Sequence, residues 1–412
     1  MHVVLVSSFY YPTLRGGAEH TIQYLAEALV RAGVQVSVVS LNDQGKEERY
    51  QHNGVECRSL PVRNLAACLN ARNPAPAVAK AIWHLVDVYN PLAGRVLEQH
   101  LRDLRPDIVQ THNLPGWSCA AWTAARRTCP IHVQVLHDYQ LTCPTATRFR
   151  NGTNCISTCA SCRPFSTLRQ RLSQRVTHVV ANSDYTRQLH RQLGFFRHAR
   201  SFDVIHGAVP TPPNPPENVP AGRTLRIGYL GRLHPTKGLD LLIDAYLAAN
   251  LPGATLRIAG RGTEAYEAEL RQKTRGLAVE FVGQQESAKF LSTLDVLVAP
   301  SLWNEPMGRV VIEAATQGVP VIASNRGGIP ELVDEGKTGW LFDPATPAPL
   351  EKILRQLTPT RLGAMREDCR QHAEKFSPEN IAAQWLNLYA TLRTQVSPNV
   401  LPSRRPEPAP IP

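Results

Sequence analysis

The sequence of 412 residues lacks any apolar run near the roughly 18–20 residues that a membrane-spanning helix requires. Its first residues, 1–6, lack the basic segment and the cleavage site of a secretory signal peptide and are typical of a buried strand. These absences predict a cytoplasmic protein, and nine cysteines are then expected to be reduced. Charged residues make up only 19% of the chain, below the roughly 25% of an average globular protein, while 43% is apolar, so we expect large cores.

Negative charge is scarce in the first half of the chain. Residues 1–205 contain 23 Lys+Arg and 13 Asp+Glu, whereas residues 206–412 contain 22 and 21. Such an excess of positive charge indicates an anionic partner, which can be a lipid surface, a nucleic acid or an anionic acceptor. No nucleic-acid-binding motif accompanies it. The sequence therefore favours an anionic membrane surface, and the alternative is a soluble domain that is merely basic.

Strand and helix patterns alternate along the chain. Strands are predicted at 3–8, 34–40, 107–110, 131–136 and 179–181, and then at 225–230, 255–259, 279–283, 295–299 and 319–323. This alternation predicts an α/β protein with parallel sheets that are covered on both faces, one doubly wound sheet in each half.

The domain boundary is predicted at a proline-rich segment. Residues 210–222 contain six prolines, which is typical of a semi-rigid linker. We therefore expect a first domain over 1–205, a linker over 206–222 and a second domain over 223–378. A last amphipathic helix, 379–396, is expected to cross back to the first domain, and the tail 397–412, with its many prolines, is expected to be disordered.

Two acids frame the loop and helix that follow the strand 295–299. Glu305 lies in the loop, and Glu313 lies eight residues further on in a helical pattern. In a continuous helix eight residues span roughly 12 Å, more than the roughly 5–9.5 Å between paired glycosidase carboxylates. Between them, Gly308 permits close backbone approach and a helix N-terminus attracts an anion. The pattern predicts two acids that bind the hydroxylated ends of one nucleoside diphosphate sugar, and the alternative is an acidic loop followed by a solvated helix acid.

Two other strand-to-helix loops have features of phosphate sites. Gly16 and Gly17 lie where the loop after the first strand meets a helix, although the three-glycine dinucleotide fingerprint is missing and a simple tight turn is the alternative. Arg232 and Lys237 flank the loop that precedes the first helix of the second domain. Two cations ahead of a helix N-terminus form a clamp for a diphosphate.

Histidines follow two strands of the first domain. His112 comes just after the strand 107–110, and His137, followed by an acid, comes just after the strand 131–136. Ligands of open α/β sheets bind at the carboxyl ends of strands. His137 is therefore the stronger candidate for polar chemistry and His112 a weaker one, although a single histidine is more often structural.

Cysteines are concentrated in one short segment of the first domain. Cys143, Cys155, Cys159 and Cys162 have the spacing C-x11-C-x3-C-x2-C. Four thiols within 20 residues predict a structural zinc site, and the alternatives are redox-sensitive thiols or small core residues. After them, residues 163–200 contain eight arginines and one acid, and a stripe of Leu168, Leu172 and Val176 suggests either a basic interfacial helix or an ordinary helix that covers the sheet.

These motifs together resemble the GT-B glycosyltransferases of family 4 (group 1), which retain the configuration of the transferred sugar. The resemblance covers roughly residues 1–393 and rests on these groups of residues: Gly16-Gly17, Gly231-Arg232-Leu233 with Lys237-Gly238, Gly260-Arg261-Gly262, and Glu305-Pro306-Met307-Gly308 with Glu313. The segment from His137 to Pro144 is similar to a subgroup assigned to polysaccharide or lipid-linked glycan assembly. The chain departs from the family after residue 205, where His206-Gly207 replaces the usual Asn-Gly pair.

The resemblance implies two Rossmann-like domains that face each other across a cleft, with the GDP- or UDP-sugar held mainly by the second domain and the acceptor by the first. No catalytic metal is expected. The implied catalytic residues are His137, Arg232, Lys237 and Glu305. The implied donor-binding residues are Gly16, Gly17, Arg232, Lys237, Val282, Glu305, Met307, Gly308, Arg309, Val310 and Glu313, with His112 on the acceptor side.

Within that resemblance each side chain has an implied role. Arg232 and Lys237 would neutralise the departing diphosphate. Glu305 would bind sugar hydroxyls and Glu313 the ribose. The implied activity is transfer of a hexose to a glycan or polyprenyl-linked acceptor at the cytoplasmic membrane face, in polysaccharide or glycolipid synthesis. The alternatives are a non-catalytic partner subunit that binds a nucleotide sugar, and a sugar-nucleotide epimerase of the same fold.

Overall fold

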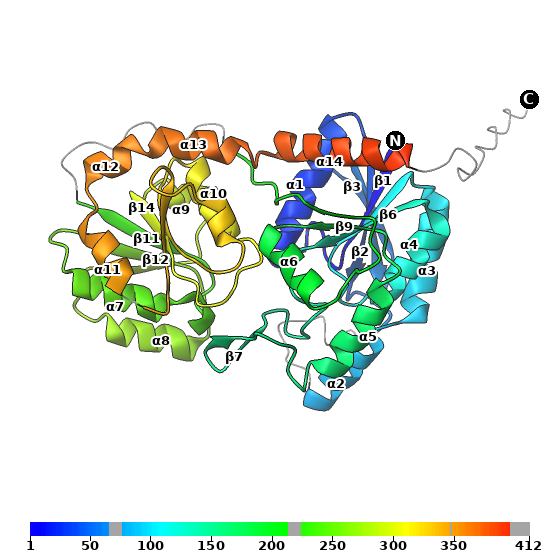
Figure 1. The fold of residues 1–412 in the computed structure, drawn as a ribbon, viewed down its shortest axis with the longest axis horizontal. Helices are drawn as coiled ribbons and strands as arrows, with labels where there is room; N and C mark the ends of the chain where they lie inside the picture. The colour runs from blue at the N-terminus through cyan, green and yellow to red at the C-terminus, as the bar shows by residue number, and fades with distance from the viewer. Residues whose placement is uncertain (66–75, 213–223, 347, 396–412) are drawn as a thin grey trace, which may run out of the picture.

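The computed structural model describes residues 1–65, 76–212, 224–346 and 348–395, which form two α/β domains side by side (Figure 1). Most of the predicted linker, Cys68 and the predicted tail 397–412 lie outside the described residues. No helix in the described part of the chain is both long and apolar enough to pass through a lipid bilayer. The predicted architecture of two doubly wound parallel sheets is confirmed.

The first sheet has eight strands in the order β10-β9-β6-β5-β1-β2-β4-β3. Its strands are β1 (His2–Val6), β2 (Gln35–Asn42), β3 (Glu48–His52), β4 (Val55–Pro61), β5 (Ile108–Thr111), β6 (Ile131–Leu136), β9 (His178–Ala181) and β10 (Ser201–Val204). All neighbouring pairs are parallel except β3 and β4, which form an antiparallel hairpin that the sequence did not predict.

The second sheet has six parallel strands in the order β13-β12-β11-β14-β15-β16. Its strands are β11 (Arg226–Leu230), β12 (Thr255–Ala259), β13 (Val279–Gly283), β14 (Val296–Ala299), β15 (Val321–Ser324) and β16 (Gly339–Phe342). In chain order this is 3-2-1-4-5-6, the arrangement of a dinucleotide-binding fold, so the strand order reverses between β11 and β14. A small hairpin of β7 (Phe149–Arg150) and β8 (Thr153–Asn154) stands apart from both sheets.

Helices cover both faces of each sheet (Figure 1). Those of the first domain are α1 (Gly17–Arg31), α2 (Ala77–Val86), α3 (Pro91–Leu104), α4 (Ala120–Thr128), α5 (Arg163–Ser173) and α6 (Asp184–Gln192). The others are α7 (Leu239–Ala249), α8 (Glu264–Lys273), α9 (Ser287–Leu291), α10 (Arg309–Thr316), α11 (Ala348–Arg355), α12 (Pro359–Ala364), α13 (Arg366–Glu374) and α14 (Pro378–Thr394), with 3-10 turns η2 (Pro235–Lys237) and η3 (Ile329–Leu332).

Alternate residues of the central strands enter separate cores on the two faces of a sheet. In β1, Val4 and Val6 belong to the core on one face, and Val3 and Leu5 belong to the core on the other. Continuous apolar strands of this kind are what a sheet covered on both sides requires. The expected stripe of Leu168, Leu172 and Val176 is wrong as a helix face, because α5 ends at Ser173 and Val176 is buried in the core beyond it.

The N-termini of the helices fall into two groups. Side chains cap α3 (Asn90), α6 (Ser183), α8 (Thr263) and α14 (Ser377). In contrast, α1, α7 and α10 begin after Gly16, Gly238 and Gly308, and no side chain caps them. The first N–H groups of α7 and α10 therefore keep their capacity to bind an anion, whereas in α1 the N–H groups of Gly16 and Glu19 bond the Glu19 carboxylate.

The last helix packs against the first domain. Ile381, Trp385 and Tyr389 of α14 join the core beneath α1, and the Gln110 side-chain amide of β5 donates a hydrogen bond to the Tyr389 hydroxyl. The chain thus passes twice between the domains (Figure 1). The two passages contact each other, because the Val209 N–H donates to the Phe376 carbonyl at 2.9 Å.

Candidate functional site

The carboxyl ends of the two sheets meet between the domains. In the second sheet the order reverses between β11 and β14, and the loops after these strands contain Lys237 and Glu305. In the first sheet the order reverses between β1 and β5, and the loops after these strands contain Gly16 and His112. Ligands of doubly wound sheets bind at such reversal points. The fold therefore places the predicted residues of both halves at one interface.

Lys237 and Glu305 form a direct ion pair. The Lys237 Nζ lies 2.5 Å from the Glu305 Oε1, and the Ser301 hydroxyl donates to the same oxygen at 2.6 Å. Burial alone would raise the pKa of Glu305, but the Lys237 charge and the hydrogen bonds from Lys237, Ser301 and Trp303 outweigh it and hold that pKa below its ordinary value. Glu305 is therefore ionised at neutral pH and can accept hydrogen bonds from hydroxyl groups.

The loops that carry this pair fit together because of glycine. Gly238 has a φ of 72°, and a Cβ placed on it would lie 2.0 Å from the Pro300 carbonyl oxygen. Gly327 has a φ of 62°, and a Cβ there would lie 2.0 Å from the Glu305 carbonyl oxygen. The backbone around Glu305 is thus packed between two loops that only glycine permits to come so close.

Glu313 is held on the first turns of α10. The Arg309 Nε lies 2.6 Å from one carboxylate oxygen of Glu313, and the Ser287 hydroxyl donates to the other at 2.6 Å. Ser287 begins α9, which follows the strand that ends with Val282 and Gly283. Glu313 therefore contacts the start of α9, after the β13–α9 loop, whereas Glu305 contacts η2, so the two acids have separate partners.

The bare N-termini of α1 and α10 lie close together. A Cβ built on Gly17 would lie 3.3 Å from the Arg309 side chain, and the Arg309 guanidinium lies 5.2 Å from the centre of the Tyr24 ring of α1. Two uncapped helix ends from different domains thus converge on one place. Such a convergence is suited to an anion with several oxygens, such as a diphosphate.

The remaining predicted donor-side residues are distributed around this place. Arg232 is exposed at the end of β11 and forms no salt bridge with any residue that the structure describes. Val282 and Val310 are partly buried against the core of the second domain. Met307 is buried, and its sulfur accepts the Gly207 N–H at 3.3 Å, so it contacts the connection between the domains.

His112 and His137 form a hydrogen-bonded pair. The His112 Nδ1 and the His137 Nε2 are 2.9 Å apart, and the rings stack with their centres 5.2 Å apart. Burial lowers the pKa of His137 to about 4, and burial with the neighbouring ring lowers the pKa of His112 well below its usual value. Both rings are therefore neutral at pH 7. The structure brings together two residues that the sequence placed on two separate strand ends.

Two acids beside the histidines were not assigned a role by the sequence. Burial raises the pKa of Asp138 to about 6, and Glu19 is one of the charges that raise it further. Glu19 itself is buried, and that burial raises its pKa although its carboxylate is hydrogen-bonded by the Asn113 side chain and by backbone N–H groups of the first turn of α1. Glu19 is the third residue of α1, the position where a Glu side chain commonly bonds the N–H groups at the start of a helix. A search of the sequence for this capping pattern would have identified Glu19.

The structure holds the 302–304 segment from the first domain. The Asn154 amide donates to the Leu302 carbonyl at 2.8 Å and accepts the Asn304 N–H at 2.7 Å. The Tyr139 hydroxyl donates to the Asn304 carbonyl at 2.7 Å. Asn154 ends the β7–β8 hairpin, which reaches the second domain in Figure 1. We call these contacts of Asn154 and Tyr139 the asparagine clasp. No local sequence pattern predicts them.

A second contact between the domains is made by Glu331. One of its carboxylate oxygens accepts the Asp184 N–H at 2.7 Å and the other accepts the Tyr185 N–H at 2.9 Å, so an acid of the second domain caps α6 of the first. Burial would raise the pKa of Glu331, but His206 and these N–H groups lower it. The carboxylate is thus kept ionised where the partial positive charge of α6 favours it.

The four cysteines do not form the predicted zinc site. In the described parts of the chain, no three His, Cys, Asp or Glu side chains meet in a group suited to a metal ion. The Cys143 and Cys162 sulfurs are hydrogen-bonded at 3.8 Å, while Cys159 Sγ lies 3.3 Å from the Ser161 hydroxyl, so these thiols have local partners instead. The described structure thus does not assemble the four thiols into a metal-binding group, and zinc binding stays a prediction; the cysteines are free thiols.

Comparison with known families agrees with this geometry. The family model described as glycosyl transferases group 1 matches residues 212–376, and a glycosyl transferase 4-like domain matches residues 16–206. The chain belongs to the group 1 glycosyl transferases. The prediction of a family 4 glycosyltransferase with the GT-B fold is thus confirmed.

Relatives of this glycosyltransferase occur in several bacteria. An uncharacterized 42.6 kDa protein in the cps region of Klebsiella pneumoniae is 33% identical over 81% of this chain and 87% of its own length. Sucrose-phosphate synthase from Thermosynechococcus elongatus has a TM-score of 0.74 at 20% identity, over 96% of this chain and 100% of that one. The Anabaena protein HepE, in complex with UDP-glucose, has a TM-score of 0.66 at 20% identity, over 95% and 100%. At 20% identity, the similarity to these last two proteins is a similarity of fold alone.

Proposed function

We propose that this glycosyltransferase is a retaining enzyme that moves a hexose from a GDP- or UDP-sugar to a glycan or polyprenyl-linked acceptor. The observation that carries the proposal is the Lys237–Glu305 ion pair at the strand reversal of the second sheet, with the uncapped N-terminus of α10 beginning three residues after Glu305. A cation, an ionised acid and bare N–H groups at one place are the groups that a sugar diphosphate requires.

In this mechanism the bond between the sugar C1 and the diphosphate oxygen breaks while an acceptor hydroxyl bonds to C1 on the same face. The hydroxyl proton passes to a phosphate oxygen of the leaving group. Lys237 and Arg232 balance the charge that grows on the diphosphate, and the N–H groups at the start of α10 contribute to the same task. Glu305 orients the donor sugar through its hydroxyls, and Glu313 binds the ribose.

The first domain is proposed to bind the acceptor. His137 and His112 lie at the ends of β6 and β5 and stay neutral, so they can donate and accept hydrogen bonds without adding charge beside the donor. The relative from the cps region of Klebsiella pneumoniae supports a place in polysaccharide or glycolipid synthesis. The UDP-glucose bound to HepE supports a UDP-sugar among the two donor classes.

Thermal unfolding with UDP, GDP, ADP or TDP tests the donor. A nucleotide at about 100 times its dissociation constant stabilises the folded protein by about 2.7 kcal/mol. We expect UDP or GDP to raise the melting temperature more than ADP and TDP. A melting temperature that none of the four changes would contradict the proposal. Proton NMR of the first-formed product then decides whether the configuration at C1 is retained.

A further inference from the structure

Helix α2 exposes a row of large apolar side chains, which an ordinary surface helix would bury. Val78, Ile82 and Leu85 fall on one helical stripe and are 72%, 49% and 62% exposed, while Trp83 on the opposite side is only 7% exposed. A further apolar side chain in the first turn of the next helix, α3, is also exposed: Leu92 is 60% exposed. A contiguous apolar stripe of this length marks an interaction surface.

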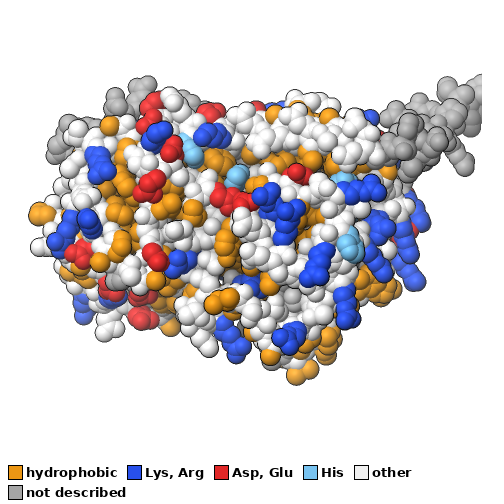
Figure 2. Space-filling view, in the orientation of Figure 1, with side chains coloured by type: hydrophobic (Ala, Val, Ile, Leu, Met, Phe, Trp, Pro, Cys, Tyr) orange, Lys and Arg blue, Asp and Glu red, His pale blue; other side chains and the backbone are white. Residues whose placement is uncertain are grey.

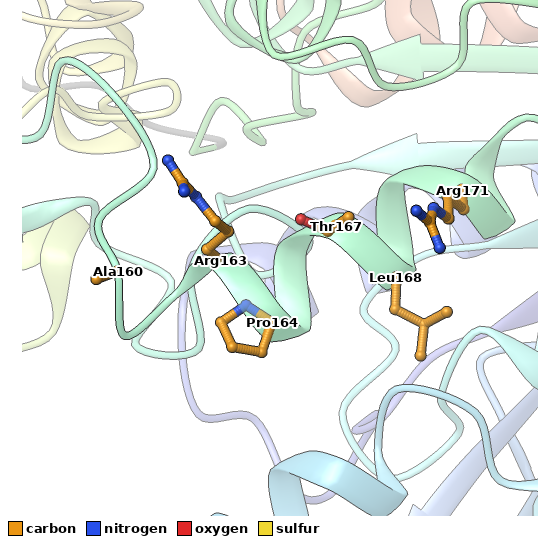
Figure 3. Close-up of a pocket in the computed structure, with 6 residues that line it drawn as sticks. All are labelled: Ala160, Arg163, Pro164, Thr167, Leu168 and Arg171. Atoms are coloured by element: carbon orange, nitrogen blue, oxygen red, sulfur yellow. The ribbon is translucent and has the colours of Figure 1, made fainter.

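Helix α5 extends this surface. The His84 ring of α2 packs edge-on against the Phe165 ring of α5 with their centres 5.9 Å apart. Beyond this contact, Leu168 is 45% exposed and, with Pro164, lines an open hollow of about 530 Å³ (Figure 3). In Figure 2 hydrophobic side chains gather at the lower edge of the molecule, where Figure 1 places α2 and α5.

The surroundings of this surface are basic. The sequence between Asp138 and Asp184 has six arginines and no acid. Arg163 and Arg171 line the same hollow as Leu168, and Lys80 lies on α2. The acid that follows α2, Asp87, is buried in an ion pair with Arg169 at 3.3 Å and adds no negative charge to the surface.

We propose that this surface, the α2–α5 face, docks on an anionic lipid bilayer. A helix with a broad apolar stripe and flanking cations lies in the plane of the headgroups, with its apolar side chains in the acyl boundary and its cations at the phosphates. A second copy of the chain fits less well, because a self-paired α2–α5 face would bring arginines of one copy against arginines of the other. The proposal assigns a membrane contact to the domain that is proposed to bind the acceptor.

Sedimentation of the full-length protein with vesicles tests this docking. Vesicles of phosphatidylcholine with about one third phosphatidylglycerol are compared with phosphatidylcholine alone, at low and at high salt. We expect binding to the anionic vesicles that weakens as salt rises, because exposed charges are screened. Absence of binding, or equal binding to both vesicles, would overturn the proposal.

Matched variants locate the contact. Ile82→Ser with Leu85→Ser is expected to weaken vesicle binding at least tenfold, whereas Leu247→Ser with Leu277→Ser, which removes leucines 37% and 40% exposed on the second domain, should leave it unchanged. Arg163→Gln with Arg171→Gln is expected to reduce the salt dependence, and Arg275→Gln with Lys352→Gln serves as its control. Equal losses in a test pair and its control would overturn the assignment.

Two further measurements separate the explanations. If the unaltered protein is a dimer that Ile82→Ser with Leu85→Ser makes monomeric, the α2–α5 face is a contact between copies and the lipid proposal is overturned. The stabilisation by UDP or GDP, measured without lipid, shows that each variant is folded. This docking rests on the proposed function only for its biological role: intact vesicle binding without a nucleotide effect would contradict the proposed function and leave the docking in place.

Discussion

The two domains share a fold but build their parts of the site differently. In the second domain the pair Lys237 and Glu305 follows two neighbouring parallel strands, and glycines at 238 and 327 press the loops together. In the first domain the segment 137–162 leaves the sheet, forms only the short β7–β8 hairpin and reaches the other domain through the asparagine clasp. The donor half is fixed by local backbone geometry, and the other half by contacts across the interface.

This difference indicates which substitutions should reduce activity or stability most. A substitution within the tightly packed loops of the second domain should disturb the conformation of the loop itself, because its neighbours leave no room for it to shift. Residues that depend on an interdomain contact can be lost while both domains stay folded. The following expected results are arranged from the largest effect to the smallest.

Lys237→Ala should have the largest effect, because it removes the cation from the donor side. By analogy with the loss of one preorganised charge-stabilising group, the rate of transfer should fall by about 10²–10³-fold. The Glu305 carboxylate, whose side chain is only 12% exposed, would lose its cationic partner, and this should lower the stability of the fold by about 1–3 kcal/mol. Release of nucleoside diphosphate and urea denaturation measure the two effects.

The double variant Lys237→Ala with Glu305→Gln separates charge from structure. It should recover most of the stability, because no unpaired carboxylate remains, but none of the activity. Lys352→Ala, which removes an exposed lysine of α11, is the matched control. A rate for Lys237→Ala within threefold of the control would remove Lys237 from the mechanism.

Gly238→Ala should destabilise the second domain by about 2–4 kcal/mol, through the left-handed backbone and the contact of the new methyl group with the Pro300 carbonyl. Gly276→Ala is a matched control, since Gly276 has a φ of 77° but nothing within 4 Å of an added Cβ. The control should lose only about 1 kcal/mol from backbone strain. Equal losses, measured by urea denaturation, would show that the approach to Pro300 does not matter.

Asn154→Ala should affect binding of the donor more than stability. It removes two hydrogen bonds to the segment 302–304, each worth about 0.5–1.5 kcal/mol, so the KM for the donor should rise about 5- to 100-fold. The melting temperature should change little, because the hairpin lies outside both cores. Ser157→Ala, in the same segment and exposed, is the control. An unchanged KM would show that the clasp does not position the donor loop.

His137→Gln should have the smallest effect, on the pH dependence of stability. Burial in the folded protein holds the pKa of His137 at about 4, below its ordinary value of 6.5, so the unfolded chain binds the proton first. Stability is therefore present above pH 6.5 and is lost as the pH falls towards 4. Between pH 7 and pH 6 the variant should lose less stability than the unaltered protein, by below about 1 kcal/mol. His198→Gln, at an exposed position, should keep the original slope.

The sequence was sufficient for the fold because the apolar strands of both domains are continuous and regularly spaced. It predicted that Glu305 and Glu313 bind two parts of one ligand, which stays a prediction; the structure shows that Glu305 contacts η2 and Glu313 contacts Ser287 at the start of α9. The sequence analysis assigned Lys237 and Glu305 separate roles, whereas the structure shows them in contact. Their contact could not be predicted from the sequence, because it depends on β11 and β14 being neighbours in the sheet.

Other features depended on contacts between distant segments and left no pattern to find. Asn154 is one polar residue in an irregular segment, and its partners lie about 150 positions away. The exposed stripe of α2 was not predicted, because only the structure shows that Trp83, and not Ile82 or Leu85, faces inward. The four-cysteine spacing led to the zinc prediction, which stays a prediction; the structure adds that the Cys143 and Cys162 sulfurs, 19 positions apart in the chain, lie 3.8 Å from each other.

The return of α14 constrains how the molecule can move. The two passages between the domains lie against each other through Val209 and Phe376, so any change in the angle between the domains would have to bend both passages along this one line. Rotation about that line leaves the passages intact and opens the edge where Asn154 meets Leu302. If product leaves and fresh donor enters by such an opening, the hydrogen bonds of the asparagine clasp must break each time, and the rate of opening would set an upper limit on turnover.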